Sequence, residues 1–234
     1  MNMGKRIENA KKAIDKNKLY NLDDAISFFI NEYSSKYSVK FDETIEFILK
    51  LGIDAKQSDQ MVRGAVAMPN GLGKEKKVAL IIEDSRLDEG KNSGAEEVGG
   101  DNLIEKIKGG FLDFEACVAT PAMMPKISKI GKLLGPKGLM PNPKLGTVSD
   151  DVVSAVKNIK KGQIEFRIDK NGIIHSGVAK LGFDKKKTKE NIIKLYNAIL
   201  AAKPQKSKGI FMKEIFLSCT HGPSLKLDLK SFVV

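Results

Sequence analysis

The chain has 234 residues, of which 41% are hydrophobic, so it can form packed cores in two domains. It contains no run of about 18 or more apolar residues, and its start resembles neither a secretion signal nor a transit peptide. This composition argues against a membrane protein and predicts a cytoplasmic one. Cys117 and Cys219 have no neighbouring Cys or His at ligand spacing, so we expect buried thiols and neither a disulfide framework nor a zinc site.

Positive charge is distributed unevenly along the chain. The formal net charge is +11, and the sequence pI is about 9.4. Residues 161–234 contain 15 cations and 6 anions, a net charge of +9, whereas residues 1–68 (11 and 10) and residues 69–160 (14 and 13) each carry +1. This concentration favours a polyanionic partner, because each lysine placed against a phosphate releases condensed counterions. The cations are 36 Lys and 4 Arg, which suits phosphate attraction better than bidentate recognition of bases.

The first segment predicts two helices and one long strand. Apolar residues recur with helical spacing in residues 4–17, and Asn21 is suited to cap a second helix that continues to Ile30. Between Phe41 and Ile53, six apolar residues fall on odd positions, and four polar or charged residues fall on even ones: Phe41, Ile45, Phe47, Leu49, Leu51 and Ile53 against Asp42, Thr44, Glu46 and Lys50. This alternation predicts a strand with one buried face.

The middle segment has a different pattern. It follows residues 68–74, which are rich in turn formers. The continuous apolar runs within Lys77–Glu83 and Phe114–Thr120 are each followed by helix-compatible sequence, which predicts a small parallel βαβ layer. Ser149 is expected to cap a helix that reaches Ile159, because acids follow it in the first turn.

Strands return in the last third. Gln163–Asp169 and Gly172–Val178 flank an Asp-Lys-Asn-Gly turn and predict a hairpin. Residues 184–202 predict a helix, and Phe211–Cys219 and Ser224–Leu229 predict two final strands. The apolar face expected for that helix contains Ile192, Ile193, Tyr196, Ile199 and Leu200.

These elements predict an α/β protein with a discontinuous domain. The single strand near the N-terminus cannot bury its own face, so residues 1–68 are expected to fold together with residues 161–234. Residues 69–160 would then form an inserted domain.

The sequence offers little support for catalysis. His175 and His221 are the only histidines, and neither lies in a hydrolase, metalloprotease or Cys-paired motif. The stretch Gly131–Gly138 is not a Walker A loop, since it lacks the final Gly-Lys-Ser/Thr and Pro136 removes an amide that a phosphate cradle would use. We therefore expect no enzyme, no cofactor and no metal. A nucleotide-dependent enzyme is the alternative class, and binding of ATP, GTP or NAD would favour it.

Two basic or polar segments suggest RNA contacts. Residues 126–147 contain five lysines and no acid, which favours a second, weaker RNA or tRNA contact through Lys129, Lys132, Lys137 and Lys144. A rigid Gly/Pro loop that shapes the domain explains this segment equally well. The turn at residues 220–223 offers a hydroxyl, exposed backbone and, at Gly222, room for close approach to phosphate or ribose, although a plain hairpin turn also fits. A general single-strand RNA chaperone is disfavoured, because 6% aromatic residues and no Trp leave few stacking platforms.

Several long motifs resemble one family. Lys132–Lys144 (KLLGPKGLMPNPK), with Lys129-Ile-Gly before it, closely resembles the signature of the ribosomal protein L1 family. Further resemblance lies in residues 41–46 (FDETIE), 51–60 with 62–64, and 163–167 (QIEFR). The motifs occur in the family's order, between about residue 5 and residue 228.

This resemblance implies a fold, partners and a site. The fold would be a split β-α-β domain (1–68 plus 161–234) with an inserted Rossmann-like domain (69–160). The chain would be a non-enzymatic monomer in the large ribosomal subunit that binds 23S-type rRNA at the mobile L1 stalk, assists release of E-site tRNA and represses translation of its own operon mRNA. Carried over by motif, the main RNA surface comprises Lys40, Phe41, Thr44, Ser218, Thr220, His221 and Gly222, with phosphates held around it by Arg167 and Lys180. Where this chain has His221 the family usually has Met, so the contact chemistry there should differ.

Overall fold

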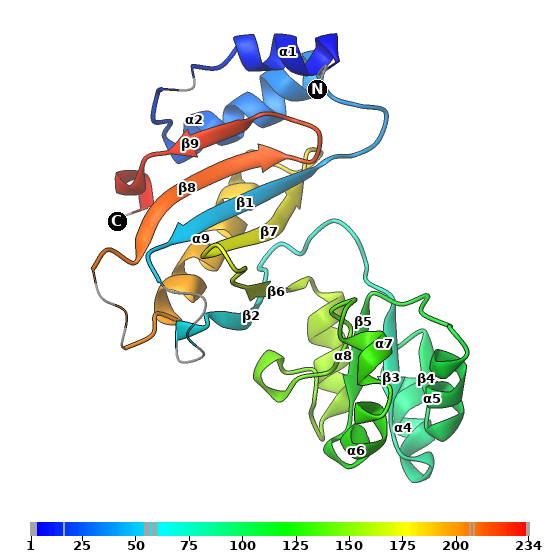
Figure 1. Cartoon of the computed structure of the whole chain (residues 1–234). Coiled ribbons are helices and arrows are strands. Elements are labelled where there is room, and N and C mark those ends of the chain that lie inside the picture. Colours follow the sequence, from blue (N-terminus) through cyan, green and yellow to red (C-terminus); the bar gives the residue numbers. More distant parts are fainter. Residues whose placement is uncertain are drawn as a thin grey trace. The chain divides into compact units, whose positions relative to one another are not determined.

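The computed structural model describes residues 4–15, 17–53, 57, 60–205, 207 and 209–232. Part of one family-like motif, residues 54–56 and 58–59, therefore lies outside the described residues. The chain divides into two compact units, Met1–Gly73 with Ile164–Val234 and Lys74–Gln163 (Figure 1). The boundaries expected from the sequence, 68/69 and 160/161, precede these divisions by a few residues. The predicted α/β class is confirmed by the mixture of helices and strands, which includes a parallel sheet.

The first unit is built on a four-stranded antiparallel sheet with the order β7-β1-β8-β9. Strand β1 (Thr44–Leu51) lies between β7 (Ile173–Lys180) and β8 (Met212–Cys219), and β9 (Ser224–Leu227) follows β8. The odd residues of β1 are buried and the even ones are not, as the alternation predicted. A strand from the N-terminal segment thus completes a sheet from the C-terminal segment.

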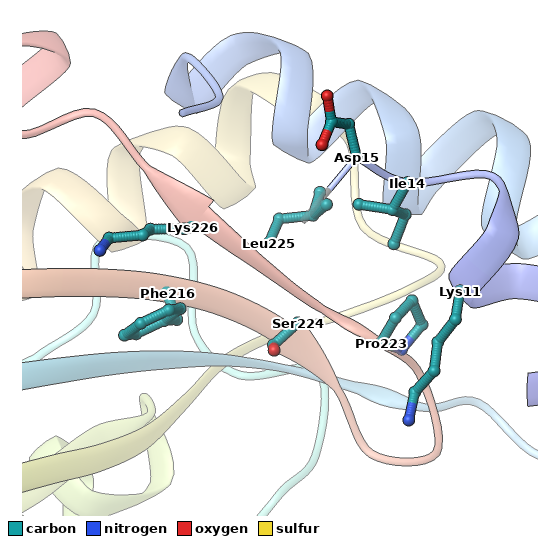
Figure 2. Close-up of a pocket in the computed structure, with 8 residues that line it drawn as sticks. All are labelled: Lys11, Ile14, Asp15, Phe216, Pro223, Ser224, Leu225 and Lys226. Carbon is teal, nitrogen blue, oxygen red and sulfur yellow. The ribbon is translucent and has the colours of Figure 1, made fainter. Parts of the chain in front are cut away.

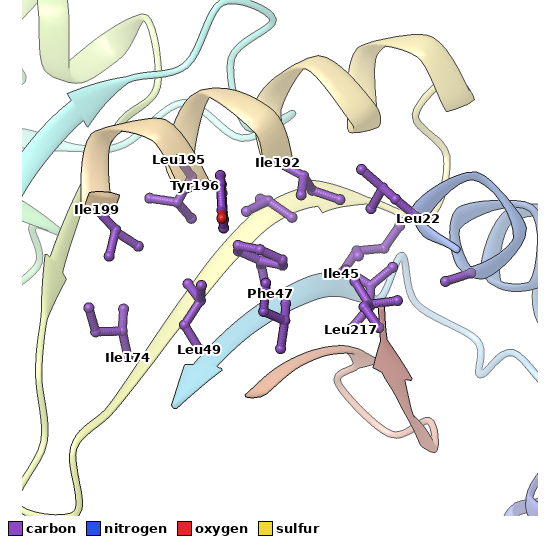
Figure 3. Close-up of a cluster of buried hydrophobic side chains, with 14 of the residues drawn as sticks. Leu22, Ile45, Phe47, Leu49, Ile174, Ile192, Leu195, Tyr196, Ile199 and Leu217 are labelled. Atoms are coloured by element: carbon purple, nitrogen blue, oxygen red, sulfur yellow. The ribbon is translucent and has the colours of Figure 1, made fainter. Parts of the chain in front are cut away.

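Helices cover one face of this sheet. The unit contains α1 (Lys5–Lys12), α2 (Leu22–Ser27), a π-helical segment (Phe28–Tyr33), α3 (Ser34–Lys36), α9 (Lys185–Ala201) and a 3-10 turn (Leu229–Phe232). Figure 3 shows the side chains of α9 directed toward Phe47, Leu49 and Ile174 of the sheet. The predicted face of α9 is wrong at Leu200, which is 44% exposed, because Leu195 takes the inward position instead.

Two further expectations for this unit need correction. The helix expected to end at Ile30 continues to Lys36. Asn21 is the N-cap residue, as expected, although its side chain makes no capping hydrogen bond. The Asp-Lys-Asn-Gly turn forms, with Gly172 at φ +81°, but the flanking strands do not make a hairpin. Strand β6 (Gln163–Arg167) pairs with β2 (Arg63–Ala67) in a separate two-stranded sheet, whereas β7 pairs with β1. The turn residues fix only the local reversal, and strands from the N-terminal segment take the ladder hydrogen bonds of both β6 and β7.

The second unit is a three-stranded parallel sheet between two helical layers. Its order is β4-β3-β5, formed by β4 (Glu97–Gly99), β3 (Val78–Ile81) and β5 (Ala116–Ala119). The helices are α4 (Leu87–Asn92), α5 (Asp101–Lys108), α6 (Met124–Ser128), α7 (Gly131–Leu134) and α8 (Val152–Lys160), with 3-10 turns at Asp84–Arg86, Pro121–Met123 and Pro143–Leu145. Alternate residues of β3 enter two separate cores, one on each face. Burial on both faces explains the continuous apolar run in the sequence.

The cap of α8 differs from the prediction by two residues. Asp151, and not Ser149, is the N-cap residue, and its carboxylate accepts the N–H of Ser154 at 3.0 Å. The Ser149 hydroxyl instead accepts the N–H of Asp151. An acid is itself a good capping residue, so either position satisfied the sequence pattern.

Both cysteines are free and buried, as expected. Within the described ranges, none of the helices has the length and apolar character needed to cross a membrane.

Candidate nucleic-acid interface

Three chain segments meet where β1 begins and β8 ends. The Thr44 N–H donates to Oγ1 of Thr220 at 3.0 Å, and the Thr220 N–H donates to the Thr44 carbonyl at 3.1 Å. From the end of β7, Lys180 Nζ donates to Oγ1 of Thr44 at 2.8 Å and to the Asp42 carbonyl at 3.1 Å. An ammonium group has three donors, so Lys180 keeps one for a ligand. The structure therefore brings together three of the residues expected to bind RNA.

Two exposed rings stand beside this junction. Phe41 and His221 pack edge to face, with ring centroids 5.5 Å apart and an interplanar angle of 78°. Phe41 is 51% exposed, and the His221 and Lys40 side chains are also exposed. A large apolar ring exposed next to a lysine is suited to contact a ribose or an unstacked base.

Gly222 has a different role from the one expected. It was expected to leave room for phosphate or ribose, but a Cβ at this position would point into the protein. It would lie 2.9 Å from Cβ of Cys219, 3.1 Å from Cζ of Tyr33 and 3.2 Å from the Tyr33 hydroxyl. The position therefore requires glycine because the turn lies directly on the buried Tyr33 ring.

The sheet face opposite α9, which we call the outer face, extends from this turn. One row across its strands contains, in register, His175, Ile48, Phe216 and Lys226. The next row on β1 and β8 pairs Lys50 with Glu214. Glu214 accepts from Lys50 at 3.1 Å and from Lys226 at 2.6 Å, and these two lysines hold the pKa of its carboxyl below the usual range. The outer face thus combines apolar, aromatic and paired charged groups.

A cavity of about 320 Å³ lies between the end of α1 and the β8–β9 hairpin (Figure 2). Residues of both segments line it: Lys11, Ile14, Asp15, Phe216, Pro223, Ser224, Leu225 and Lys226. Pro223 directly follows the turn at Gly222. Ser218, another expected contact, lies at the same end of β8, where its hydroxyl donates to the carbonyls of Cys219 at 3.3 Å and Pro223 at 3.4 Å.

The remaining expected residues belong to other elements of the chain. Arg167 ends β6 in the two-stranded sheet and is exposed. The four lysines of the second expected contact belong to the other compact unit, are all exposed, and pair with no acid among the described residues: Lys129, Lys132, Lys137 and Lys144.

Motif reasoning also missed the support beneath the turn. Glu43 is fully buried next to Thr44, and its carboxylate accepts the N–H of His221. Two polar side chains from the N-terminal helices, Arg6 and Tyr33, join it. The sequence carries one signal for it, because Glu43 takes an odd position in the alternation from Phe41 to Ile53, where the other residues are apolar. An acid on the buried side of a strand is rarely without partners.

Comparison with known proteins identifies the family. The model of the Ribosomal protein L1p/L10e family matches residues 30–223. The chain belongs to this family. Two curated proteins, both called large ribosomal subunit protein uL1, come from Lactobacillus johnsonii and Lactobacillus gasseri. Each is 46% identical to this chain over 225 residues, which is 96% of this chain and 96% of the relative.

The L1-family match includes every expected RNA-binding residue, from Lys40 to Gly222. It also includes the four lysines of the second unit and the two buried supports Tyr33 and Glu43. Arg6 lies N-terminal to the matched range but within a chain that the relatives cover almost completely.

Proposed function

We propose that this L1-family protein is a component of the large ribosomal subunit and binds rRNA with one composite surface. That surface consists of the Phe41–His221 ring pair, the Thr44–Thr220 junction with Lys180, and the adjoining outer face. The observation that carries the proposal is the convergence of an exposed aromatic pair, hydroxyls and a lysine from three distant segments. The relatives named as large-subunit proteins and the +9 charge of residues 161–234 support it.

Each group has a distinct task in this proposal. Phe41 and His221 fit against a ribose or base, and the Ser218 and Thr220 hydroxyls address ribose 2′-OH groups, which distinguish RNA from DNA. Lys40, Lys180 and Arg167 hold phosphates, and these contacts orient the RNA without reading its sequence. Gly222 allows the turn to pack closely enough for the rings and hydroxyls to share one surface.

Family membership also supports finer proposals about the partners. The rRNA target would be the L1 stalk of 23S-type rRNA, in the cytoplasmic ribosome. The same surface would bind the protein's own operon mRNA, so translation would be repressed only when free protein exceeds its rRNA sites. The exposed lysines of the second unit would contact E-site tRNA and assist its release, and residues 68–74 and 159–163 would act as hinges for that unit.

A binding measurement with the full chain tests the proposal. We compare a stalk-type structured RNA with random single strands at equal salt, because affinities are interpretable only at a fixed salt concentration. Phe41→Ala is expected to weaken binding of the structured RNA by roughly 5- to 150-fold, since stacking on an aromatic ring contributes about 1–3 kcal/mol per base.

The matched control is Ile210→Ala, which removes an exposed apolar side chain outside the cluster. It should leave affinity unchanged. Equal losses for the two variants, or equal affinity of the natural chain for both RNAs, would remove the basis for this surface. Crosslinking in intact ribosomes gives an independent check, because RNA attached mainly to residues 74–163 would contradict the assignment.

A further inference from the structure

A buried hydrogen-bond network supports the exposed turn from beneath. Oε1 of Glu43 accepts two hydrogen bonds, from the His221 N–H at 2.9 Å and from the Tyr33 hydroxyl at 3.2 Å. Both Glu43 and Tyr33 are fully buried. The carboxylate therefore lies between the protein interior and the backbone of a residue that we expect to contact RNA.

Arg6 extends this network to the N-terminal helix. Its guanidinium donates to the Tyr33 hydroxyl at 3.0 Å, to the His221 carbonyl at 3.0 Å and to the Tyr37 carbonyl. The His221 backbone is thus held at both its N–H, by Glu43, and its carbonyl, by Arg6. Within α1 itself only Ala10 is buried, so these hydrogen bonds add to a small buried contact.

The protonation state of Tyr33 suits this bridging role. Burial is the main cause that raises the pKa of Tyr33 to about 12, and the nearby Glu43 carboxylate adds to it against the opposing effect of Arg6. The phenol is therefore neutral at physiological pH. It accepts from Arg6 and donates to Glu43 at the same time, which a phenolate could not do.

A buried carboxylate is expensive unless donors surround it. Oε2 of Glu43 has no hydrogen-bond partner in the described part of the chain, so the donors on Oε1 must offset most of the cost. Those donors are the turn itself and the Tyr33 hydroxyl. Any movement of the His221 backbone away from Glu43 would leave the charge with fewer partners, and this penalty restrains the turn.

We propose that Glu43, Tyr33 and Arg6 are positioning residues for RNA binding. They contact no RNA; they fix the backbone of the turn, so that the His221 ring stays against Phe41 and the Thr220 hydroxyl stays on Thr44. A site that is already in its binding geometry avoids the cost of ordering it on association. This inference rests on the proposed RNA-binding function of the same turn.

The central test compares Tyr33→Phe with Tyr37→Phe in the full chain. Each removes one phenolic hydroxyl, but only the Tyr33 hydroxyl belongs to the network. The Tyr37 hydroxyl makes no hydrogen bond among the described residues, and Arg6 contacts the Tyr37 backbone carbonyl, which Tyr37→Phe keeps. Three quantities are measured: the urea midpoint, the hydrogen-exchange rate of the His221 amide, and the affinity for the stalk-type RNA. We expect Tyr33→Phe to remain folded, to speed His221 exchange at least tenfold and to weaken RNA binding about fivefold or more. Tyr37→Phe should change neither exchange nor affinity.

A second pair of variants separates positioning from simple stability. Glu43→Gln keeps an acceptor for the His221 N–H and should retain most of the affinity, whereas Glu43→Leu removes the acceptor and should lose at least tenfold. If Glu43→Gln lost as much as Glu43→Leu at equal urea midpoints, the acceptor role would be wrong.

The outcomes also distinguish this inference from the function on which it rests. Unchanged His221 exchange in Tyr33→Phe overturns the inference, whatever the RNA result. Faster exchange with unchanged RNA affinity also overturns it, provided that Phe41→Ala still weakens binding. If Phe41→Ala has no effect either, the proposed function itself fails, and the positioning role fails with it.

Discussion

Replacing Gly222 by alanine is expected to disturb RNA binding out of proportion to the size of the change. The added Cβ would lie 2.9 Å from Cβ of Cys219 and 3.1 Å from Cζ of Tyr33. Carbon atoms at optimal contact are roughly 3.5–4.0 Å apart, so this methyl group cannot fit without movement. Tyr33 and Cys219 are both buried and cannot swing into solvent. The turn must therefore shift outward.

The size of the effect follows from overpacking. Extra methyl groups in well-packed positions cost about 1–3 kcal/mol. If the turn must return to its original position to bind RNA, the same energy is lost from binding, which corresponds to a roughly 5- to 150-fold weaker Kd, since about 1.4 kcal/mol is tenfold.

The assay measures the Kd for the stalk-type RNA and the urea midpoint of each variant. Gly182→Ala is the matched control, because a Cβ at this glycine would approach only the Asp42 carboxylate, at 3.9 Å and 4.0 Å. Lys40→Ala is the comparison for charge. It should reduce the affinity for RNA only slightly, and the reduction should be smaller still at higher salt. If Gly222→Ala cost no more affinity than Lys40→Ala, binding would depend on charge alone and the fit of the turn would be irrelevant.

Two further predictions concern thiols and helix capping. Burial raises the pKa of the Cys117 thiol to about 12 and also raises the pKa of the Cys219 thiol. Neither thiol should therefore react with iodoacetamide in the folded chain at neutral pH, while both should react in urea. Rapid alkylation of the folded protein would contradict this, because it would show that the thiols are accessible. Asp151→Ala should lower the urea midpoint more than Ser149→Ala, because only Asp151 caps α8. Hydrogen bonds from Ser154 hold the pKa of Asp151 below its usual value. The Asp151 carboxylate therefore stabilises the folded chain fully above its usual pKa, and this stabilisation is lost as the pH falls through the lowered pKa. A midpoint difference between the natural chain and Asp151→Ala that is the same at pH 7 and pH 2.5 would contradict this.

Features that depend on neighbouring residues were predicted well from the sequence. The alternation in β1 gave its buried face because the side-chain period of a strand is fixed by local geometry. The apolar run of β3 gave a strand buried on both faces for the same reason. The pairing of β6 with β2 was missed because a turn signal reports only where the chain reverses, and the choice of partner strand is a tertiary property. The sequence could not show which of Leu195 and Leu200 in α9 is buried, because this depends on which side of the helix packs against the sheet.

In the candidate site, too, some residues were predictable from sequence motifs and others only from the tertiary structure. Motif resemblance selected Phe41, Thr44 and the Thr220–Gly222 turn, and the structure brings these segments together. It could not select Arg6, which is 215 positions from the His221 carbonyl that it contacts. Nor could it show that Gly222 faces inward, because a glycine required by packing and one required by a ligand look identical in a sequence.

In the proposed function, different parts of the first unit would attract RNA by charge and recognise its shape. The outer face is not uniformly basic, since Glu46 and Glu214 lie on it and Glu214 already pairs with Lys50 and Lys226. RNA phosphates would be attracted only weakly to the centre of the outer face, because the carboxylates of Glu46 and Glu214 repel them. Attraction must come mainly from lysines at the margin, which act over about a Debye length and weaken with salt. In the proposed function, discrimination between a structured RNA and any other polyanion would then depend on the turn, which buried groups that salt does not reach hold in place. Raising the salt concentration should thus reduce affinity for all RNAs while preserving, or increasing, the preference for the structured one.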